Sequence, residues 1–400
     1  MGNSFLTKNK IADRIVRAYW YALAMIVRAC VRVRHGQVMC WAYSFRQYGC
    51  NPKYITEYIL ANCPEDFSIV WAFKRNVDVS VVSGRVKTVR VPSIMYLYYL
   101  YTSEFIITNS RNKRYYSCFK KKNGQKYIMC WHGSLPLKKI EKDSEHPLEQ
   151  VYVRDAKDDS RMCDIMLSGN KFFTDILHRA FWYDGKVLEC GEPRHDIYFE
   201  KGRHQQLRRE ILGKLNVPDT TKIVMYAPTF RNYGSDFSHY DLDWNRITPL
   251  LGQALKSEVV VFVRLHPNII EQVDVDEKLN NPDLRNMCFY HDMQELMCVT
   301  DILITDYSST MFEAALLGRL CLLYADDIED YDRGFYFRLS DLPFPLATTK
   351  QQLEYNIEHM DRTAQLERQF RFLRDTMKVM ENGMASKEVV RWMKRNTNQY

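Results

Sequence analysis

The sequence lacks the motifs that mark several large enzyme classes. It contains no G-x-G-x-x-G and no G-x-x-x-x-G-K-[ST], which argues against dinucleotide redox chemistry and against nucleotide hydrolysis by a P-loop. It also contains no G-x-S-x-G, the turn that carries the nucleophile of many hydrolases. If the chain is an enzyme, it holds its substrate by other means.

Closely spaced cysteines and clustered metal ligands are also missing. No two of the eleven cysteines lie closer than ten positions, which excludes C-x-x-C zinc or redox spacing. The odd number argues against a secreted disulfide framework, so we predict reduced, mostly buried thiols of a cytosolic protein. Neither the acidic run at Asp155–Asp159 nor Asp326-Asp327 has the spacing of a metal site, and we predict no metal.

The positive charge is concentrated at the start of the chain. The net charge is +7 over 400 residues, but residues 1–35 alone carry +6 and the rest only +1. A basic leader on a nearly neutral body indicates an anionic surface rather than nucleic acid as the partner. The length suits two domains of average size.

The leader is expected to be an amphipathic helix. Residues 11–34 contain no proline or glycine, and apolar residues such as Ile11, Ile15 and Ile26 recur on one face with arginines on another. Its uninterrupted apolar stretch, Ala18–Val27, is ten residues, whereas a membrane span needs about 20. We predict an interfacial helix on anionic lipid, the alternative being a helix packed on the protein's own core.

Polar turns follow five strand-like apolar runs, and they suggest a phosphorylated substrate. In open α/β sheets, ligands bind outside the carboxyl ends of the strands. Turns that place His, Arg, Thr and Ser there indicate an enzyme. The five turns are Cys130–Ser134, Gly191–His195, Ala227–Arg231, Arg264–Pro267 and Thr305–Ser309.

Strand-like runs alternate with helical runs along the chain, which indicates βαβ units and parallel sheets. The expected architecture is α/β and GT-B-like, with two Rossmann-like parallel-sheet domains facing a cleft. The predicted segments are the leader (1–35), an N-terminal Rossmann-like domain (36–199), a C-terminal Rossmann-like domain (200–345) and C-terminal helices (346–400). The predicted strands include 37–44, 68–74, 105–108, 162–167, 223–226, 259–265, 287–290, 302–305 and 321–324.

The segment Asp301–Gly318 reads as a strand, a turn and a helix that ends at the glycine. Free N–H groups and the positive end of the dipole make a helix start an anion site, to which Ser308 and Ser309 would add hydroxyl donors. Glu313 could accept a hydrogen bond from a ribose or polyol hydroxyl. The alternative is that Ser308 is only an N-cap and Glu313 only compensates the helix dipole.

Two histidines and three arginines complete the candidate site. His132 and His266 each follow a strand, where an imidazole can take a proton or stabilise phosphate charge. A single histidine at such a place is more often structural, but two at equivalent places favour catalysis. Arg194, Arg231 and Arg264 offer permanently charged partners for phosphate oxygens, unless they are only solvated.

These motifs together resemble the CDP-glycerol glycerophosphotransferase family, which builds teichoic acids and related capsule polymers in bacteria. The resemblance runs in order from about Asn51 to Phe337. It rests on Trp131–Lys139, Gly191–Asp196, Tyr226–Arg231, Arg264–Pro267, Thr305–Thr310 and Arg333–Phe337.

The resemblance implies a GT-B fold and transfer of glycerol phosphate from CDP-glycerol, with CMP leaving and no metal or other cofactor. By this resemblance His132 would be the general base on the acceptor hydroxyl, and His266 would stabilise charge on the diphosphate. The implied acceptor is a lipid-linked glycan or polyol phosphate at the cytoplasmic face of the membrane, to which the enzyme would bind peripherally. The acceptor side would be the domain at 36–199 and the donor side the domain at 200–345. Donor binding would fall to Gly133, Ser134, Leu135, Pro136, Arg194, Pro228, Thr229, Arg264, Ser308, Ser309 and Glu313. Arg231 and Leu265, in the same turns, are further substrate-binding candidates.

The sequence departs from the family pattern at two places near the donor site. Ser134-Leu135-Pro136 stands where Thr-Pro commonly follows the glycine, and His195 replaces the usual Asn. These departures leave the polyol open, so CDP-ribitol is a second possible donor. A nucleotide-sugar glycosyltransferase on the same fold is a further reading of the sequence, and so is a non-enzymatic protein that binds anionic membranes or nucleic acid.

Overall fold

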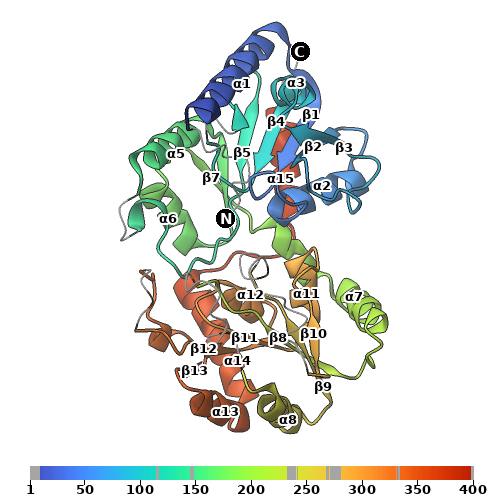
Figure 1. The fold of residues 1–400 in the computed structure, drawn as a ribbon, viewed down its shortest axis with the longest axis vertical. Coiled ribbons are helices and arrows are strands. Elements are labelled where there is room, and N and C mark those ends of the chain that lie inside the picture. Colours follow the sequence, from blue (N-terminus) through green and yellow to red (C-terminus); the bar gives the residue numbers. More distant parts are fainter. Residues whose placement is uncertain are drawn as a thin grey trace. The chain divides into compact units, whose positions relative to one another are not determined.

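The computed structural model describes residues 10–113, 117–144, 148–231, 240, 242–266, 270, 281–329, 331 and 334–397. Two compact units make up the chain (Figure 1). The first unit comprises Met1–Ser134, Glu141–Asp196 and Met380–Tyr400, and the second comprises Leu135–Ile140 and Ile197–Val379. The first nine residues of the predicted leader, and Pro267 and Arg333 of the family motifs, lie outside the described residues.

The first unit is built on a sheet with strand order β3-β2-β1-β4-β5-β6-β7, and every neighbouring pair is parallel. Its elements in chain order are α1 (Lys10–Cys30), β1 (Arg34–Trp41), α2 (Cys50–Asn62), β2 (Ser68–Lys74), β3 (Lys87–Val91), α3 (Ile94–Thr102), β4 (Ser103–Thr108), β5 (Lys126–Met129), α5 (Gln150–Met162), β6 (Ile165–Ser168), α6 (Lys171–Ala180), β7 (Lys186–Glu189) and α15 (Ala385–Asn396).

The second unit is built on a sheet with strand order β10-β9-β8-β11-β12-β13, again entirely parallel. Its elements are α7 (Lys201–Lys214), β8 (Lys222–Tyr226), α8 (Trp244–Leu255), β9 (Val259–Val263), β10 (Leu284–Asn286), α11 (Met293–Val299), β11 (Ile302–Thr305), α12 (Thr310–Leu316), β12 (Leu320–Tyr324), β13 (Leu346–Ala347), α13 (Lys350–Glu358) and α14 (Arg362–Arg371), followed by a π-helical turn (Phe372–Met377).

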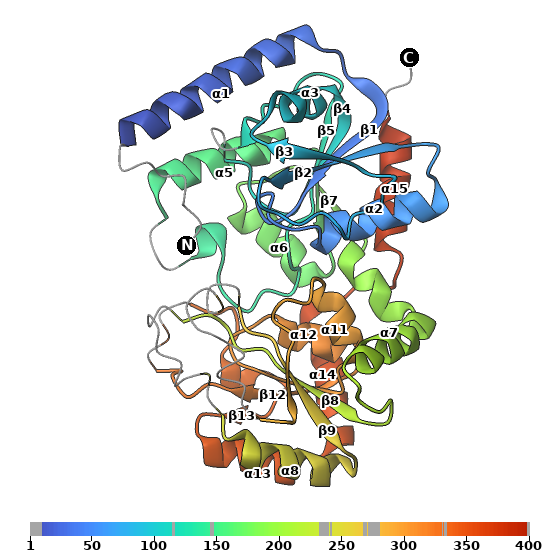
Figure 2. The ribbon, with the colours of Figure 1, turned by 45° about the vertical axis from the view of Figure 1, so that its right-hand side comes forward.

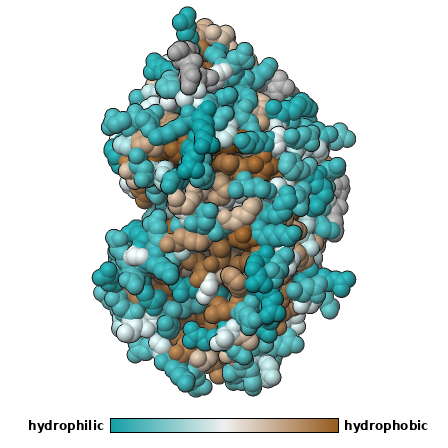
Figure 3. Space-filling model, turned by 180° about the vertical axis from the view of Figure 1, so that it is seen from behind, coloured by the Kyte–Doolittle hydropathy of each residue, from teal (hydrophilic) through white to brown (hydrophobic). Residues whose placement is uncertain are grey.

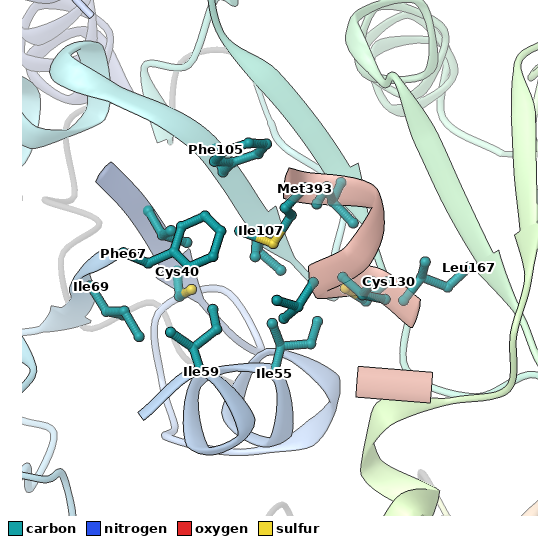
Figure 4. Close-up of a cluster of buried hydrophobic side chains, with 14 of the residues drawn as sticks. Cys40, Ile55, Ile59, Phe67, Ile69, Phe105, Ile107, Cys130, Leu167 and Met393 are labelled. Carbon is teal, nitrogen blue, oxygen red and sulfur yellow. The ribbon is translucent and has the colours of Figure 1, made fainter. Parts of the chain in front are cut away.

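The central strands are apolar along their length because helices cover both faces of a parallel sheet. In the first unit, Ile69 to Phe73 of β2 are all buried, and a core forms between the sheet, α2 and α15. Figure 4 shows Ile55 and Ile59 of α2 directed toward Cys40, Ile107 and Cys130, with Met393 of α15 beside them. The C-terminal helix is therefore part of the first unit's core.

The helix α1 lies beside α3 in the first unit (Figures 1 and 2). Ala24 is buried, and Arg28 donates to the main-chain oxygens of Lys120 and Lys121. The large apolar side chains of Ile15 and Ile26 are instead 64% and 60% exposed. These exposed side chains argue against the alternative prediction, in which the leader buries its apolar face on the protein's own core.

The fold class predicted from the sequence, two parallel-sheet α/β domains with an N-terminal helix and C-terminal helices, is confirmed. The predicted strand at 287–290 is wrong: β10 ends at Asn286, and the apolar residues after it form a loop. The expectation of buried thiols is confirmed, because all eleven cysteines are free and all but Cys30 and Cys63 are buried.

The chain divides differently from the four predicted segments. Leu135–Ile140 belongs to the second unit because Lys138 pairs with Phe335 in an isolated bridge and Tyr336 donates its N–H to the oxygen of Leu137. The predicted C-terminal segment 346–400 is split between the two units at Val379. Seen from behind, the surface is mostly hydrophilic with apolar patches among the polar side chains (Figure 3).

Candidate active site

His132 stands in the turn that follows β5, as the sequence predicts. Its Nδ1 lies 2.9 Å from the main-chain oxygen of Asn109, at the end of the neighbouring strand β4. A carbonyl oxygen only accepts, so Nδ1 carries the proton and Nε2 is the basic atom. The residue is solvent-exposed, yet protein atoms surround its ring, and this desolvation lowers the pKa of His132 against the opposing effect of the Asn109 carbonyl. A neutral imidazole with a basic Nε2 can serve as a general base.

Glu192 joins two of the predicted turns in the first unit. Its carboxylate accepts the N–H of Ser134, and its Oε2 lies 2.7 Å from Nε of Arg194 and 3.3 Å from the side-chain nitrogen of Asn51. Both Glu192 and Arg194 are buried. The turns after β5 and β7 are thereby held together, with His132, Gly133, Ser134 and Arg194 near the carboxyl ends of these two strands, which flank β6.

A possible metal-ligand set also occurs here, among the residues that the structure describes. Ligand-type atoms of Glu192, His195 and Glu381 lie within 4.8 Å of one another. Arg194 already supplies a positive charge to Glu192, and the Nδ1 of His195 lies 3.0 Å from Oε1 of Glu381. The charge of Glu192 is therefore compensated by Arg194, and an oxygen of Glu381 is already occupied by His195, which leaves little for a cation to bind. The absence of a metal remains a prediction.

In the second unit, Asp306 organises the turns after β8 and β11. Its carboxylate accepts the N–H of Thr229 at 2.9 and 3.0 Å and pairs with the guanidinium of Arg231 at 2.6 Å. Arg231 also forms two bonds with Asp327 and is buried. Desolvation opposes its charge, but the hydrogen bonds to Asp327 and Asp306 and their negative charges raise the pKa of Arg231 above its ordinary value. The contacts of Arg231 therefore support a structural role, and its predicted role in substrate binding rests on its residue type and its place in a turn that follows a strand.

The turn after β9 carries Arg264, Leu265 and His266. Nη1 of Arg264 donates to the main-chain oxygens of Met287 and Cys288, both at 2.6 Å, so this arginine anchors the loop after β10. Leu265 is buried, whereas His266 is exposed and lies beside Phe230, with ring centroids 5.7 Å apart. Desolvation and then the positive charge of Lys138 lower the pKa of His266.

The start of α12 carries the two serines of the predicted anion site, which stays a prediction. The helix begins at Thr310, and Ser309 makes no capping bond with its side chain, while Oγ of Ser308 accepts from the N–H and the hydroxyl of Thr310. Glu313 is buried and accepts from the hydroxyl of Tyr198 and from the amide of Gln294 at 3.3 Å. Ser308 and Ser309 remain partly accessible.

The structure thus groups the predicted residues by unit. His132, Gly133, Ser134 and Arg194 cluster in the first unit. The other predicted residues belong to the second unit. They lie in the turns after the adjacent strands β9, β8 and β11, in the segment Leu135–Ile140, or on α12. These residues are Leu135, Pro136, Pro228, Thr229, Arg231, Arg264, Leu265, His266, Ser308, Ser309 and Glu313.

Sequence reasoning missed three residues that order these turns. Asn109 directly follows β4, so the rule of looking at strand ends could have found it. Asn51 was seen only as the start of the family resemblance, although its side chain spans from Glu192 to the amide of Arg194. No local signal marks Glu381, because its partners lie far away in the sequence.

Two parallel-sheet α/β units with histidine-, arginine- and serine-bearing turns at the carboxyl ends of their strands define a GT-B-like fold. A UDP-GlcNAc 2-epimerase from Methanocaldococcus jannaschii, only 10% identical, shares this fold with a TM-score of 0.53 over 90% of this chain and all of that chain.

The chain belongs to the CDP-glycerol:poly(glycerophosphate) glycerophosphotransferase family, whose family model matches residues 23–394. Two teichoic acid poly(glycerol phosphate) polymerases are each 31% identical over 87% of this chain. The alignment covers 49% of the Staphylococcus epidermidis protein and 89% of the one from Bacillus spizizenii. This chain thus spans about half of one relative and nearly all of the other.

Solved structures of the wall teichoic acid polymerase TagF are also similar. The polymerase superposes with a TM-score of 0.81 at 29% identity, over 96% of this chain and 95% of that one. A variant with one histidine replaced, soaked with CDPG, superposes with a TM-score of 0.82 over the same fractions.

Proposed function

We propose that this chain transfers glycerol phosphate from CDP-glycerol to a hydroxyl group of an acceptor. The acceptor oxygen forms a bond to the β-phosphorus, the bond from that phosphorus to the bridging oxygen breaks, and CMP leaves with the electron pair. The acceptor proton passes to Nε2 of His132. The product is a phosphodiester, as in a teichoic-acid-like polymer, and family membership supports this reaction class.

One observation carries the proposal at the level of the site: the 2.9 Å contact between Nδ1 of His132 and the oxygen of Asn109. This contact fixes the tautomer in which Nε2 accepts a proton, and the lowered pKa keeps the ring neutral near pH 7. His132 as a residue is also solvent-exposed, as a base for an incoming hydroxyl must be.

The second unit is proposed to contribute most of the donor contacts, in addition to those of Gly133, Ser134 and Arg194 of the first unit. The accessible hydroxyls of Ser308 and Ser309 stand at the start of α12, where backbone N–H groups favour anions. His266 would donate a hydrogen bond to the diphosphate, and the diphosphate's negative charge would oppose the effects that lower the histidine's pKa. Arg264 would act by holding its loop in place.

We further propose that the acceptor is lipid-linked and that α1 rests on an anionic membrane surface. The stripe of Ile15, Tyr19 and Ile26 on α1 is exposed and available to enter the headgroup region, while the leader carries most of the net positive charge. Among the described helices, none is both long and apolar enough to cross a bilayer. The proposed location is the cytoplasmic face of the bacterial membrane, with no nucleic-acid partner.

Ribitol phosphate is the second candidate for the transferred group. A teichoic acid poly(ribitol-phosphate) polymerase from Bacillus spizizenii is 31% identical over 188 residues, although these cover only 44% of this chain. The longer match to glycerol phosphate polymerases favours glycerol.

The test is nucleotide release by the purified protein from CDP-glycerol, CDP-ribitol and a UDP-sugar, each with a lipid-linked glycan acceptor. CMP from CDP-glycerol supports the proposal, and CMP from CDP-ribitol alone would change the polyol. Release of UDP would replace the reaction by glycosyl transfer.

A further inference from the structure

The last segment of the chain is attached to the first unit on both sides of Glu381. Before it, the N–H of Met380 donates to the oxygen of Gly169 at 2.8 Å. After it, the N–H groups of Ala385 and Ser386 at the start of α15 each donate to Asp196 at 2.8 Å. Helix α15 then packs into the first unit's core through Met393 (Figure 4). The position of Glu381 is therefore set by structure on either side.

The carboxylate of Glu381 is buried against the turn after β7. It accepts the N–H of Glu192 at 3.0 Å and Nδ1 of His195 at 3.0 Å, with 2% of its side chain exposed. The backbone makes room for it at Gly191, where an added Cβ would lie 2.6 Å from Oε2 and where φ is +91°. The turn is thus shaped around this carboxylate.

Glu192 passes this constraint on to the candidate site. While its N–H is held by Glu381, its own carboxylate accepts the N–H of Ser134 and pairs with Arg194. The hydrogen bonds of the Glu381 carboxylate are to Glu192 and His195, so its effect on the donor-site residues passes through Glu192. Glu381, Glu192 and Arg194, whose side chains are all buried, are therefore linked one after the other.

We propose that Glu381 is a positioning residue: it fixes Glu192 and His195, and thereby holds the turn at Ser134 and the guanidinium of Arg194 in the arrangement that binds the phosphates of the donor. That last step rests on the proposed function. His195, the departure from the family's usual Asn, is the partner through which Glu381 holds the far side of the same turn. The C-terminal segment would in this way act on donor affinity although its sequence lies far from the motifs.

The direct test is amide hydrogen exchange without any ligand, comparing Glu381→Ala with Glu388→Ala. The control makes the same change in the same segment, at a partly exposed ion pair with Arg391 on α15. In Glu381→Ala, we expect exchange at 130–136 and 190–196 to become about tenfold faster, because two buried donors lose their acceptor. The control should leave both segments unchanged.

Kinetics with CDP-glycerol separate positioning from general destabilisation. Glu381→Ala should raise the KM for the donor about tenfold while kcat stays within about threefold. Glu381→Gln should recover most of that loss, because its amide oxygen still accepts from Glu192 and His195. If Glu381→Ala does not fold, Glu381→Met replaces it in the comparison, because methionine fills the space of the glutamate without supplying a carboxylate oxygen as acceptor.

Two results would overturn the proposal: unchanged exchange at 130–136, or exchange that rises evenly throughout the first unit. A rise in exchange confined to the two turns supports positioning even if the wild-type protein releases no CMP from CDP-glycerol, since the exchange measurement needs no substrate. Failure of the proposed reaction and failure of this inference are therefore distinguishable.

Discussion

Arg231 and Asp327 form a two-bond ion pair, with Nε 2.7 Å from Oδ2 and Nη2 3.1 Å from Oδ1. Both side chains are almost completely buried, at 5% and 3% exposure. Nη1 of the same guanidinium lies 2.6 Å from Oδ2 of Asp306. An arginine that the sequence assigns to phosphate binding is thus engaged by two carboxylates, which indicates that it orders the turn after β8.

This arrangement predicts that Arg231→Ala lowers the free energy of unfolding by about 3–5 kcal/mol, because it leaves buried carboxylates without their counter-charge. Arg231→Lys should recover only part of the loss, since an ammonium group cannot make the paired bonds. Denaturant unfolding measures both, with Arg285→Ala, at a more exposed arginine, as the control. If Arg231→Ala kept the wild-type stability and lost only affinity for the donor, Arg231 would instead be a substrate-binding residue.

His132→Ala should reduce CMP release by about 10²–10⁴-fold, the usual contribution of a general base. His132 is an exposed residue and its ring makes one hydrogen bond, to the carbonyl oxygen of Asn109, so the thermal midpoint should change little. His359→Ala, which removes another exposed histidine, is the matched control. Turnover near the wild-type rate in His132→Ala would remove the residue from the mechanism.

His266→Ala should lower kcat by about 10²–10³-fold, because a preorganised donor to the diphosphate is lost in the transition state. Its ring contact with Phe230 is small, so the fold should survive. Steady-state kinetics with CDP-glycerol checks this effect. A rise in the KM for the acceptor with an unchanged kcat would contradict a role on the donor phosphates.

The pH dependence follows from the direction of the His132 pKa shift. Burial lowers this pKa from its ordinary 6.5, and a general base works when deprotonated. Activity should therefore be complete at neutral pH and be lost as the pH falls through a midpoint below 6.5. A profile of kcat/KM against pH measures this, and an acid limb centred above 6.5 would show that another group controls the rate.

The strand pattern predicts most of the fold because buried parallel strands are almost continuously apolar, as in Val259–Val263 of β9. The same pattern misplaced β10, since Met287 and Cys288 are apolar and buried yet lie in a loop. Motif residues at strand ends could be found from the sequence. Glu381 could not, because its role arises from contacts with residues nearly 190 positions away.

The proposed membrane contact predicts that charges on the exposed stripe of α1 abolish binding. Ile15→Glu with Ile26→Glu should weaken sedimentation with vesicles containing anionic phospholipid by at least about tenfold, since two apolar side chains no longer enter the membrane. Phe370→Glu changes an equally exposed apolar residue on α14 and should have no effect. Unaltered sedimentation of the double variant would place the contact elsewhere.

The central claim is tested most directly by following both products of one reaction. Purified wild-type protein is given CDP-glycerol and a lipid-linked acceptor, and CMP release is compared with the glycerol phosphate gained by the acceptor. The account predicts equal amounts of both, and loss of both in His132→Ala. CMP release without a gain by the acceptor, or a gain unaffected by the His132 substitution, would contradict it.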